Sequence, residues 1–210
     1  MTRIAFVSDV HGDVHALRDA LRLIDEMRIS VIVCLGDVID YGCFPDETLA
    51  LLAEREIPTL RGNHDRWALG NKSMGTNVSD LTLAARRSLK TTVPSWSAAV
   101  EGVRVAAYHA RPGNDMHGIA PDASADELHT VLAAAAADVV VCGHTHKAMD
   151  LRLGERMVVN PGALLREPAD GWERELPTPG TFGVLELPER TWTVILARTG
   201  QAIEIVRARR

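Results

Sequence analysis

Aspartate, histidine and asparagine residues cluster at the ends of short apolar segments of this sequence. The clusters read SDVHG from residue 8, GDVID from residue 36, GNHD from residue 62 and GHTH from residue 143. A fifth apolar segment, VRVAAY, ends directly before His109, so that five of the eight histidines lie at such positions. A single aspartate or histidine there usually has a structural role, but chance does not place so many at equivalent points. We therefore interpret them as parts of one functional site.

Carboxylate and imidazole groups together bind borderline-hard divalent cations such as manganese, iron, zinc, cobalt and nickel. The candidate ligands are too many for one open catalytic ion and suit two ions that share a ligand: Asp9, His11, Asp37, Asn63, His109, His144 and His146. The two oxygens of Asp37 make it the natural bridge. On extended backbone, His144 and His146 would point to the same side, so that each could bind one ion.

Two cations about 3.5–4 Å apart suit phosphoryl chemistry, because they lower the pKa of a shared water and hold phosphate oxygens. The expected nucleophile is a hydroxide that bridges the two ions. His64 directly follows a candidate ligand, and we interpret it as the general acid that protonates the leaving oxygen. Asp40 could accept a hydrogen bond from the other ring nitrogen of His64 and hold the ring in place. A plain spacer role for His64 is the alternative, and Asp65 is interpreted as the cap of the following turn.

The first third of the sequence alternates between β-like and helical patterns. Strands are predicted at residues 3–7, 31–35 and 57–60, with helices at residues 11–28 and 46–55 between them. This order is typical of a parallel α/β sheet. In such a sheet, ligands bind at the carboxyl ends of the strands, which is where the polar clusters lie.

The remainder is predicted to consist mostly of β-structure with two helices. One helix runs to Leu89 from a cap at Ser79 or Asp80, and another spans residues 124–137, capped by Ser124 with Glu127 at the capping-box position. Strands follow, the first two as a hairpin, at residues 91–100, 103–109, 139–142, 149–153, 157–160, 181–187, 191–197 and 202–206. They imply a second sheet packed on the first, with a polar loop at residues 166–180 and a frayed basic tail.

The amino-acid composition limits the classes of protein to which this chain can belong. The 210 residues are 46% hydrophobic and 24% charged, which suits a single globular domain over residues 1–210. The net charge of -5 argues against a general nucleic-acid coat protein. No apolar segment approaches the roughly 20 residues of a membrane span, and the first is too short for a signal peptide. Three widely spaced cysteines without a CxxC pair favour reduced thiols and a cytoplasmic location, with Cys34 and Cys142 in the core.

In this order, the motifs resemble those of the calcineurin-like metallophosphoesterase family: D-x-H, G-D-x-x-D, G-N-H-D/E, a later histidine and G-H-x-H. The resemblance implies a four-layer α/β/β/α sandwich, in which two facing mixed β-sheets are flanked by helices. It also implies two divalent metal ions, with His64 as the catalytic acid. One ion would be held by Asp9, His11, Asp37 and His146, and the other by Asp37, Asn63, His109 and His144. Manganese is the expected metal, with iron, zinc, nickel and magnesium as alternatives.

Tyr41 separates this sequence from several branches of that family. Protein serine/threonine phosphatases and symmetrical diadenosine tetraphosphatases have an arginine at this position, which would bind the substrate phosphate through two N–H groups. The sequence is more similar to the small bacterial phosphodiesterase-like members. Arg111, in the segment RPG after His109, is a candidate substrate-binding residue, and Asp115 and His117 are candidates for the rim of the pocket.

These features together predict a cytoplasmic, dinuclear metal-dependent phosphodiesterase that hydrolyses nucleotide-like or small phosphate esters. Its expected partner is that small substrate, with no membrane partner, and its oligomeric state is left open. One alternative is a phosphomonoesterase or protein phosphatase, which Tyr41 disfavours. The other is a non-catalytic scaffold of the same fold, whose mark would be the loss of metal ligands.

Overall fold

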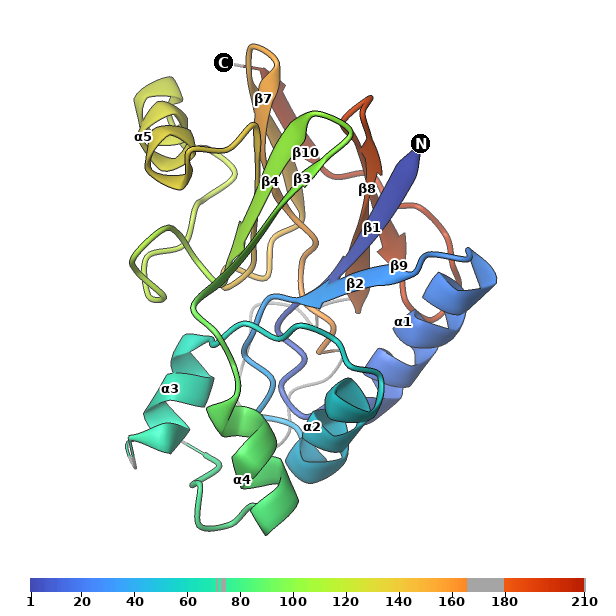
Figure 1. Ribbon diagram of the computed structural model, residues 1–210, viewed down its shortest axis with the longest axis vertical. Helices are drawn as coiled ribbons and strands as arrows, with labels where there is room; N and C mark the ends of the chain where they lie inside the picture. Colours follow the sequence, from blue (N-terminus) through green and yellow to red (C-terminus); the bar gives the residue numbers. More distant parts are fainter. Residues whose placement is uncertain (71, 73–74, 166–179, 210) are drawn as a thin grey trace.

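Two β-sheets lie face to face, and helices cover their outer faces (Figure 1). The structure is a computed structural model, and it describes residues 1–70, 72, 75–165 and 180–209. The predicted loop at residues 166–180 therefore lies almost entirely outside the described residues. Among the helices that are described, none is long and apolar enough to cross a membrane.

The smaller sheet has four strands in the order β2-β1-β8-β9. Strand β1 (Thr2–Val7) pairs in parallel with β2 (Val31–Cys34), which lies at one edge of this sheet. The other two, β8 (Thr181–Leu187) and β9 (Thr191–Leu196), add antiparallel neighbours, so the sheet is mixed.

The larger sheet has six strands in the order β10-β6-β7-β5-β4-β3. The strands are β3 (Ser95–Val100), β4 (Val103–Tyr108), β5 (Val139–Cys142), β6 (Met149–Leu153), β7 (Arg156–Asn160) and β10 (Val206–Arg209). Its centre is parallel, because β5 pairs in parallel with both β4 and β7. The carboxyl ends of β4 and β5 therefore reach the same edge of this sheet.

Apolar side chains form separate cores between these layers. The inner faces of the two sheets bury one set, which includes Phe6, Val141 and Trp192. A second core lies between the smaller sheet and the helices α1 (Val14–Glu26) and α2 (Pro45–Glu54). A third lies under α5 (Ala125–Ala135), which covers the larger sheet. The layering confirms the predicted four-layer α/β/β/α sandwich.

Local sequence explains where the long helices begin. The predicted helix at 11–28 begins only at Val14, because the Asp13 side chain accepts a hydrogen bond from Ala16 N and caps it. Residues 9–12 instead bond to the backbone after β2, as in His11 N to Asp37 O at 2.9 Å. Helix α5 begins as predicted, with the Ser124 side chain accepting from Glu127 N.

Two predicted elements differ in the middle of the chain. Residues 57–60 form only isolated bridges, because Pro58 has no N–H to continue a ladder. The segment after them was not predicted to be helical but forms α3 (Asn63–Leu69). Helix α4 (Leu83–Lys90) is capped by Thr82 and not by Ser79 or Asp80.

The C-terminal end of the described chain also differs from the prediction. The strand expected at 202–206 is reduced to a single bridge between Ala202 and Ile195. The tail expected to fray instead contributes β10, which pairs in parallel with β6. An unpaired edge of β6 offers a row of N–H and C=O groups, and the tail satisfies them.

Candidate metal centre

Five segments, four of which follow strands, bring their polar side chains together. Asp9 and His11 follow β1, Asp37 follows β2, and His109 follows β4. Asn63 and His64 form the first turn of α3, and His144 and His146 follow β5. Most of these side chains are buried, with Asp9 and His11 completely inaccessible. The site therefore forms at one edge of both sheets, from residues far apart in the sequence.

The potential ligand atoms fall into two groups, each with its members within 4.8 Å of one another. The first group is Asp9, His11 and His146, and the second is Asp37, His109 and His144. In the first, His146 Nε2 lies 3.3 Å from Asp9 Oδ1 and 3.4 Å from His11 Nε2. In the second, His109 Nε2 lies 3.3 Å from Asp37 Oδ2.

Asp37 and Asn63 connect and complete these groups. Asp37 Oδ2 is also 3.9 Å from His11 Nε2, so this carboxylate oxygen lies between the two groups. Asn63 Oδ1 is 3.1 Å from His109 Nε2 and 2.9 Å from His144 Nδ1. Asp37 is thus placed to bridge two cations, and Asn63 to add an oxygen ligand to the second group.

The donor set fits two divalent cations. Asp9 Oδ1 is a buried carboxylate oxygen that forms no hydrogen bond, which is costly unless a cation neutralises it. His11 Nδ1 and His109 Nδ1 donate to the carbonyl oxygens of Ile39 and Leu35, at 2.9 and 3.0 Å. Nε2 of each ring is thereby the atom available to a metal, which is the usual arrangement of histidine ligands, and a cation bound there would displace any proton on it.

Charge coupling within the centre is strong. Burial lowers the pKa of His11 to about 4, so its imidazole is neutral at pH 7, the form that binds metal. Burial would also lower the pKa of His109, but the charge and hydrogen bond of Asp37 outweigh it and raise this pKa to about 10. The same contact holds the pKa of Asp37 far below its usual value, against the effect of burial. Asp37 therefore stays ionised and attracts positive charge.

His64 lies next to the metal groups and is oriented by two neighbours. Its Nδ1 donates to Asp40 Oδ2 at 2.8 Å, and its Nε2 lies 3.4 Å from the Tyr41 hydroxyl. The His64 backbone N–H donates to Asp37 Oδ1 at 2.9 Å, which fixes the helix start to the second metal group. Burial would lower the pKa of His64, but the hydrogen bond to Asp40 raises it. The hydrogen bond to Asp40 therefore favours the protonated, proton-donating form of the ring.

Asp65 does more than cap the turn, which is the role that the sequence indicated. Its Oδ2 accepts from Gly62 N and from Asp37 N, both at 2.9 Å, and its Oδ1 accepts from Val38 N at 3.0 Å. The carboxylate therefore joins the loop after β2 to the start of α3. Gly62 is required beside it, because a Cβ there would overlap the Asp37 carboxylate.

Asn160, in the segment NPGA, is a second organising residue that the ligand pattern did not reveal. Its Nδ2 donates to Gly143 O at 2.8 Å and to Thr145 Oγ1 at 3.2 Å, and its Oδ1 accepts from Gly162 N at 2.8 Å. It is fully buried at the end of β7. The side chain therefore shapes the loop that carries His144 and His146.

The backbone around His144 and His146 is not extended, contrary to the reasoning from their spacing. Their φ angles are 66° and 57°, in the left-handed region. The two side chains lie in different metal groups because the loop turns, and not because a strand presents them on one face.

Arg111 lies at the base of a loop beside His109. Its guanidinium donates to the backbone oxygens of His117 and Gly118, both at 2.6 Å, and to Glu127 at 2.8 Å. The side chain therefore holds the loop in shape. Asp115, on the same loop, faces α3 and forms an ion pair with Arg66.

Sequence comparison relates this chain to known proteins. Residues 2–188 match the sequence model of the calcineurin-like phosphoesterase superfamily domain. A segment of 71 residues, 34% of this chain, is 38% identical to the uncharacterized protein MJ0912 of Methanocaldococcus jannaschii. That match spans only 29% of the relative's length.

Solved structures with a similar fold cover nearly the whole chain. A hypothetical protein from Pyrococcus horikoshii, PH1004, superposes with a TM-score of 0.74 at 18% identity, over 93% of this chain and 88% of that one. A metallophosphoesterase from Sphaerobacter thermophilus superposes with a TM-score of 0.72 at 21% identity, over 97% of this chain and 89% of that one. At these identities the likeness establishes the fold alone.

Proposed function

Because this chain belongs to the calcineurin-like phosphoesterase superfamily, we propose that it is a two-metal phosphodiesterase acting on nucleotide-like or small phosphate esters. The observation that carries the proposal is the pair of ligand groups with Asp37 between them and His64 beside them. We propose that a single domain over residues 1–210 performs this reaction.

In this proposal each candidate ligand has a role. Asp9, His11 and His146 hold one cation, and Asn63, His109 and His144 hold the other, with Asp37 shared by both. When bound, two divalent cations polarise the phosphate and lower the pKa of a water molecule between them. Manganese is proposed as the metal, since mixed carboxylate and imidazole ligands without thiolate suit it.

His64 supplies the proton for the leaving group. In this proposal its Nε2 gives the proton to the departing ester oxygen while Nδ1 keeps its hydrogen bond to Asp40. Asp40 is a positioning residue: it holds the ring and keeps it protonated, but it does not touch the substrate. Its other oxygen accepts from Thr76 N at 2.5 Å, which fixes the carboxylate in turn.

Tyr41 supports a diester over a monoester substrate. A phosphomonoester carries more negative charge at neutral pH than a diester, and an arginine at this position would compensate it. Tyr41 has no guanidinium group, and its hydroxyl lies 3.4 Å from His64 Nε2, where the leaving oxygen must come close. The position is therefore suited to contact a singly charged phosphodiester.

A comparison of two substrates with and without His64 tests this proposal. The manganese-loaded enzyme is expected to hydrolyse bis-p-nitrophenyl phosphate faster than p-nitrophenyl phosphate. His64→Ala should lower kcat by about 10²–10⁴-fold with metal content unchanged, because only proton transfer is lost. The matched control is His129→Ala, which removes an exposed histidine on α5. Normal turnover by the His64 variant would refute the assigned chemistry, and faster monoester hydrolysis would refute the substrate class.

A further inference from the structure

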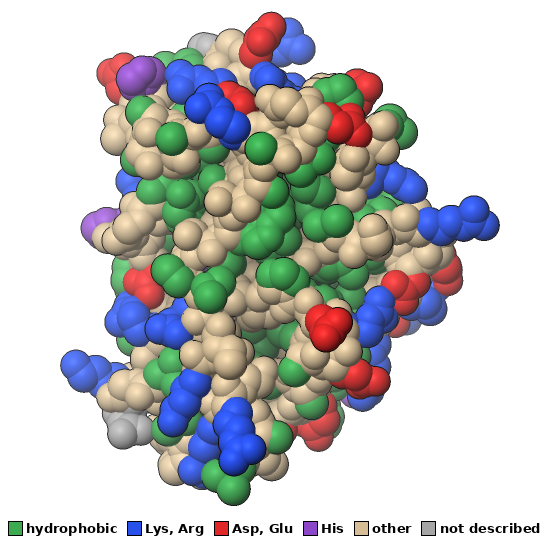
Figure 2. Space-filling model, in the orientation of Figure 1, with side chains coloured by type: hydrophobic (Ala, Val, Ile, Leu, Met, Phe, Trp, Pro, Cys, Tyr) green, Lys and Arg blue, Asp and Glu red, His purple; other side chains and the backbone are tan. Residues whose placement is uncertain are grey.

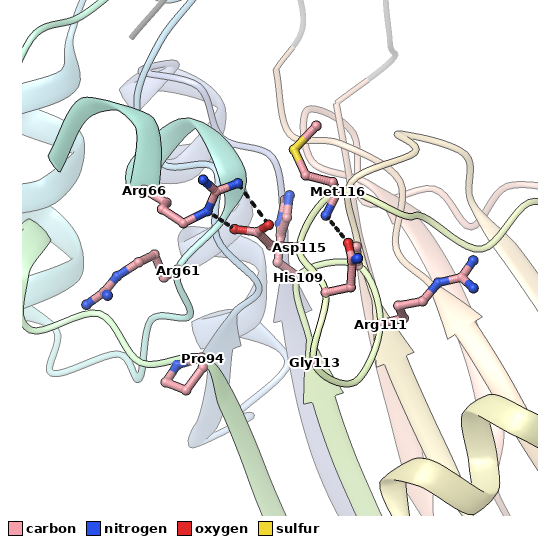
Figure 3. Close-up of a pocket in the computed structure, with 10 residues that line it drawn as sticks. Arg61, Arg66, Pro94, His109, Arg111, Gly113, Asp115 and Met116 are labelled. Carbon is pink, nitrogen blue, oxygen red and sulfur yellow. Dashed lines mark hydrogen bonds and ion pairs between the residues drawn. The ribbon is translucent and has the colours of Figure 1, made fainter. Parts of the chain in front are cut away.

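A cavity of about 430 Å³ lies beside the second metal group, and the proposed chemistry leaves it unused. It opens between the start of α3 and the loop that follows β4, and His109 forms part of its wall (Figure 3). Because His109 belongs to the metal centre, a molecule in this cavity would be adjacent to the reacting phosphate. Its volume is within the usual range for small-molecule sites.

The loop that forms one wall of the cavity is held rigid by its own hydrogen bonds. Arg111 and Asn114 exchange two backbone hydrogen bonds of 3.1 Å. Asn114 Oδ1 accepts from Met116 N at 2.8 Å and from His117 N at 2.9 Å. The Arg111 guanidinium braces the outside through Glu127, at 2.8 Å. Because this wall is already ordered, ligand binding there costs little conformational entropy.

One charged pair crosses the mouth of the cavity. Arg66 on α3 donates from Nε and Nη2 to the two oxygens of Asp115 on the loop, at 2.5 and 3.0 Å (Figure 3). The side chains remain 46% and 26% exposed, so a ligand can reach both. A guanidinium has five N–H donors and a carboxylate about four acceptor sites, so each partner keeps hydrogen-bonding capacity. The pair therefore presents donors and acceptors side by side.

Apolar surface completes the cavity. Pro94 and Gly113 contribute to its lower part as drawn, and Met116 lies at the opposite rim (Figure 3). Met116 is 42% exposed, so a ligand can reach its side chain. A thioether makes favourable contacts with aromatic rings. The wall thus combines apolar contact surface with hydrogen-bond donors and acceptors.

We propose that this cavity binds the nucleoside of a nucleotide-like phosphodiester, with Arg66 and Asp115 as specificity-determining residues. Nucleobases present a planar apolar face and an edge of hydrogen-bond donors and acceptors, to which an arginine can donate and from which an aspartate can accept. The inference rests on the proposed phosphodiesterase function and narrows its substrate class from small esters in general to nucleotide esters.

Two substrates with the same leaving group test the inference. They are the p-nitrophenyl ester of thymidine 5′-monophosphate and methyl p-nitrophenyl phosphate, which differ only in the group expected to occupy the cavity. The wild-type enzyme with manganese should show a higher kcat/KM for the nucleotide ester. Equal values would overturn the inference and leave the phosphodiesterase function standing, whereas no hydrolysis of either ester would overturn the function itself.

Variants of Arg66 and Asp115 test whether these two residues cause the preference for the nucleotide ester. Arg66→Ala and Asp115→Ala should each lower kcat/KM for the nucleotide ester about tenfold, mainly through KM, because a hydrogen bond to a charged group is lost. Both should leave the methyl ester unchanged, which shows that His64 and the metal groups are intact. Met116→Ala, at an exposed position, tests the apolar contact without removing a charge.

The matched control is Arg104→Ala, because Arg104 and Asp138 form an exposed pair of the same geometry, at 3.1 and 2.8 Å, elsewhere on the larger sheet. Calorimetric binding of thymidine 5′-monophosphate gives a readout that does not depend on turnover. Arg66→Ala should weaken it about tenfold and Arg104→Ala should not. Equal losses for both esters in the Arg66 and Asp115 variants, or unchanged nucleotide binding, would overturn the inference.

Discussion

Replacement of Asp65 by alanine should reveal how firmly the two loops of the metal centre are joined. Asp65 is fully buried, and its carboxylate accepts hydrogen bonds from Gly62 N, Asp37 N and Val38 N. In Asp65→Ala these three N–H groups lose their acceptor. A buried donor without a partner costs about 1–3 kcal/mol, so the loss is about 3–9 kcal/mol.

Removal of the buried charge offsets part of this cost. Burial and the nearby charge of Asp37 raise the pKa of Asp65 to about 6 from 3.8, although the three N–H donors favour the ionised form. At pH 7 a shift of that size corresponds to about 3 kcal/mol of destabilisation, which the alanine variant recovers. We therefore expect Asp65→Ala to lower the free energy of unfolding by about 3 kcal/mol.

Urea unfolding followed by circular dichroism, in EDTA so that metal binding does not contribute, measures this loss. Asp13→Ala is the matched control, because it removes a helix cap with a hydrogen bond to Ala16 N and should cost about 1 kcal/mol. Equal losses of stability in the two variants would refute this reasoning, because the three hydrogen bonds of Asp65 would then contribute no more to the free energy of unfolding than a single helix cap.

The other predictions concern single contacts of the centre and one surface pair. Asp37→Ala should reduce bound manganese to at most one ion per chain, measured by elemental analysis, and two retained ions would contradict the bridge. Asp40→Asn should lower kcat about 10–100-fold with metal content unchanged, and a change confined to KM would argue against a role through His64. The hydrogen bond from Arg104 lowers the pKa of Asp138 to about 2, so this pair stabilises the fold above about pH 4 and loses its effect as the pH falls toward 2. The urea midpoints of wild type and Arg104→Ala should therefore differ at pH 6 and converge near pH 2, and a constant difference would contradict this account.

Much of the architecture could be predicted because local patterns and tertiary packing agree. The strands at residues 139–142, 149–153 and 181–187 begin and end where the sequence indicated. Each is a short segment rich in apolar residues, bounded by polar or glycine-containing segments, and none lies at the edge of its sheet. The convergence of the polar clusters followed from one rule, that the carboxyl ends of parallel strands share an edge.

The missed elements are those that depend on distant partners. Helix α3 has only seven residues, too few for a periodic pattern, and its first turn is fixed because Asp65 accepts from Gly62 N and Asp37 accepts from His64 N. Strand β10 is polar and forms because the edge of β6 is available. In both cases hydrogen bonds between segments far apart in the chain are decisive, for α3 those that join Asp37 to Asp65 and His64, and a single sequence does not reveal them.

The ion pair between Arg66 and Asp115 also depends on residues that are far apart in the sequence. The sequence placed Asp115 at the rim of a pocket, but nothing near residue 66 marked its partner, 49 residues away. A specificity site formed by a helix and a loop from different parts of the chain carries no local motif. Such a site can be identified only once the fold is known.

Backbone strain gives an independent reason to regard these loops as functional. Twelve described residues other than glycine have a positive φ, and seven of them are in the centre: Asp9, His11, Asp37, Asp40, Tyr41, His144 and His146. The other five lie at helix ends and turns, where such angles are common. Each left-handed residue costs about 1–2 kcal/mol, so seven cost about as much as the whole stability of a typical domain. Burial in the cores on both sides of each sheet must offset this cost. Packing alone does not explain why the strained residues are concentrated at one edge of the sheets. The need to present carboxylates and imidazoles to a pair of cations does explain it.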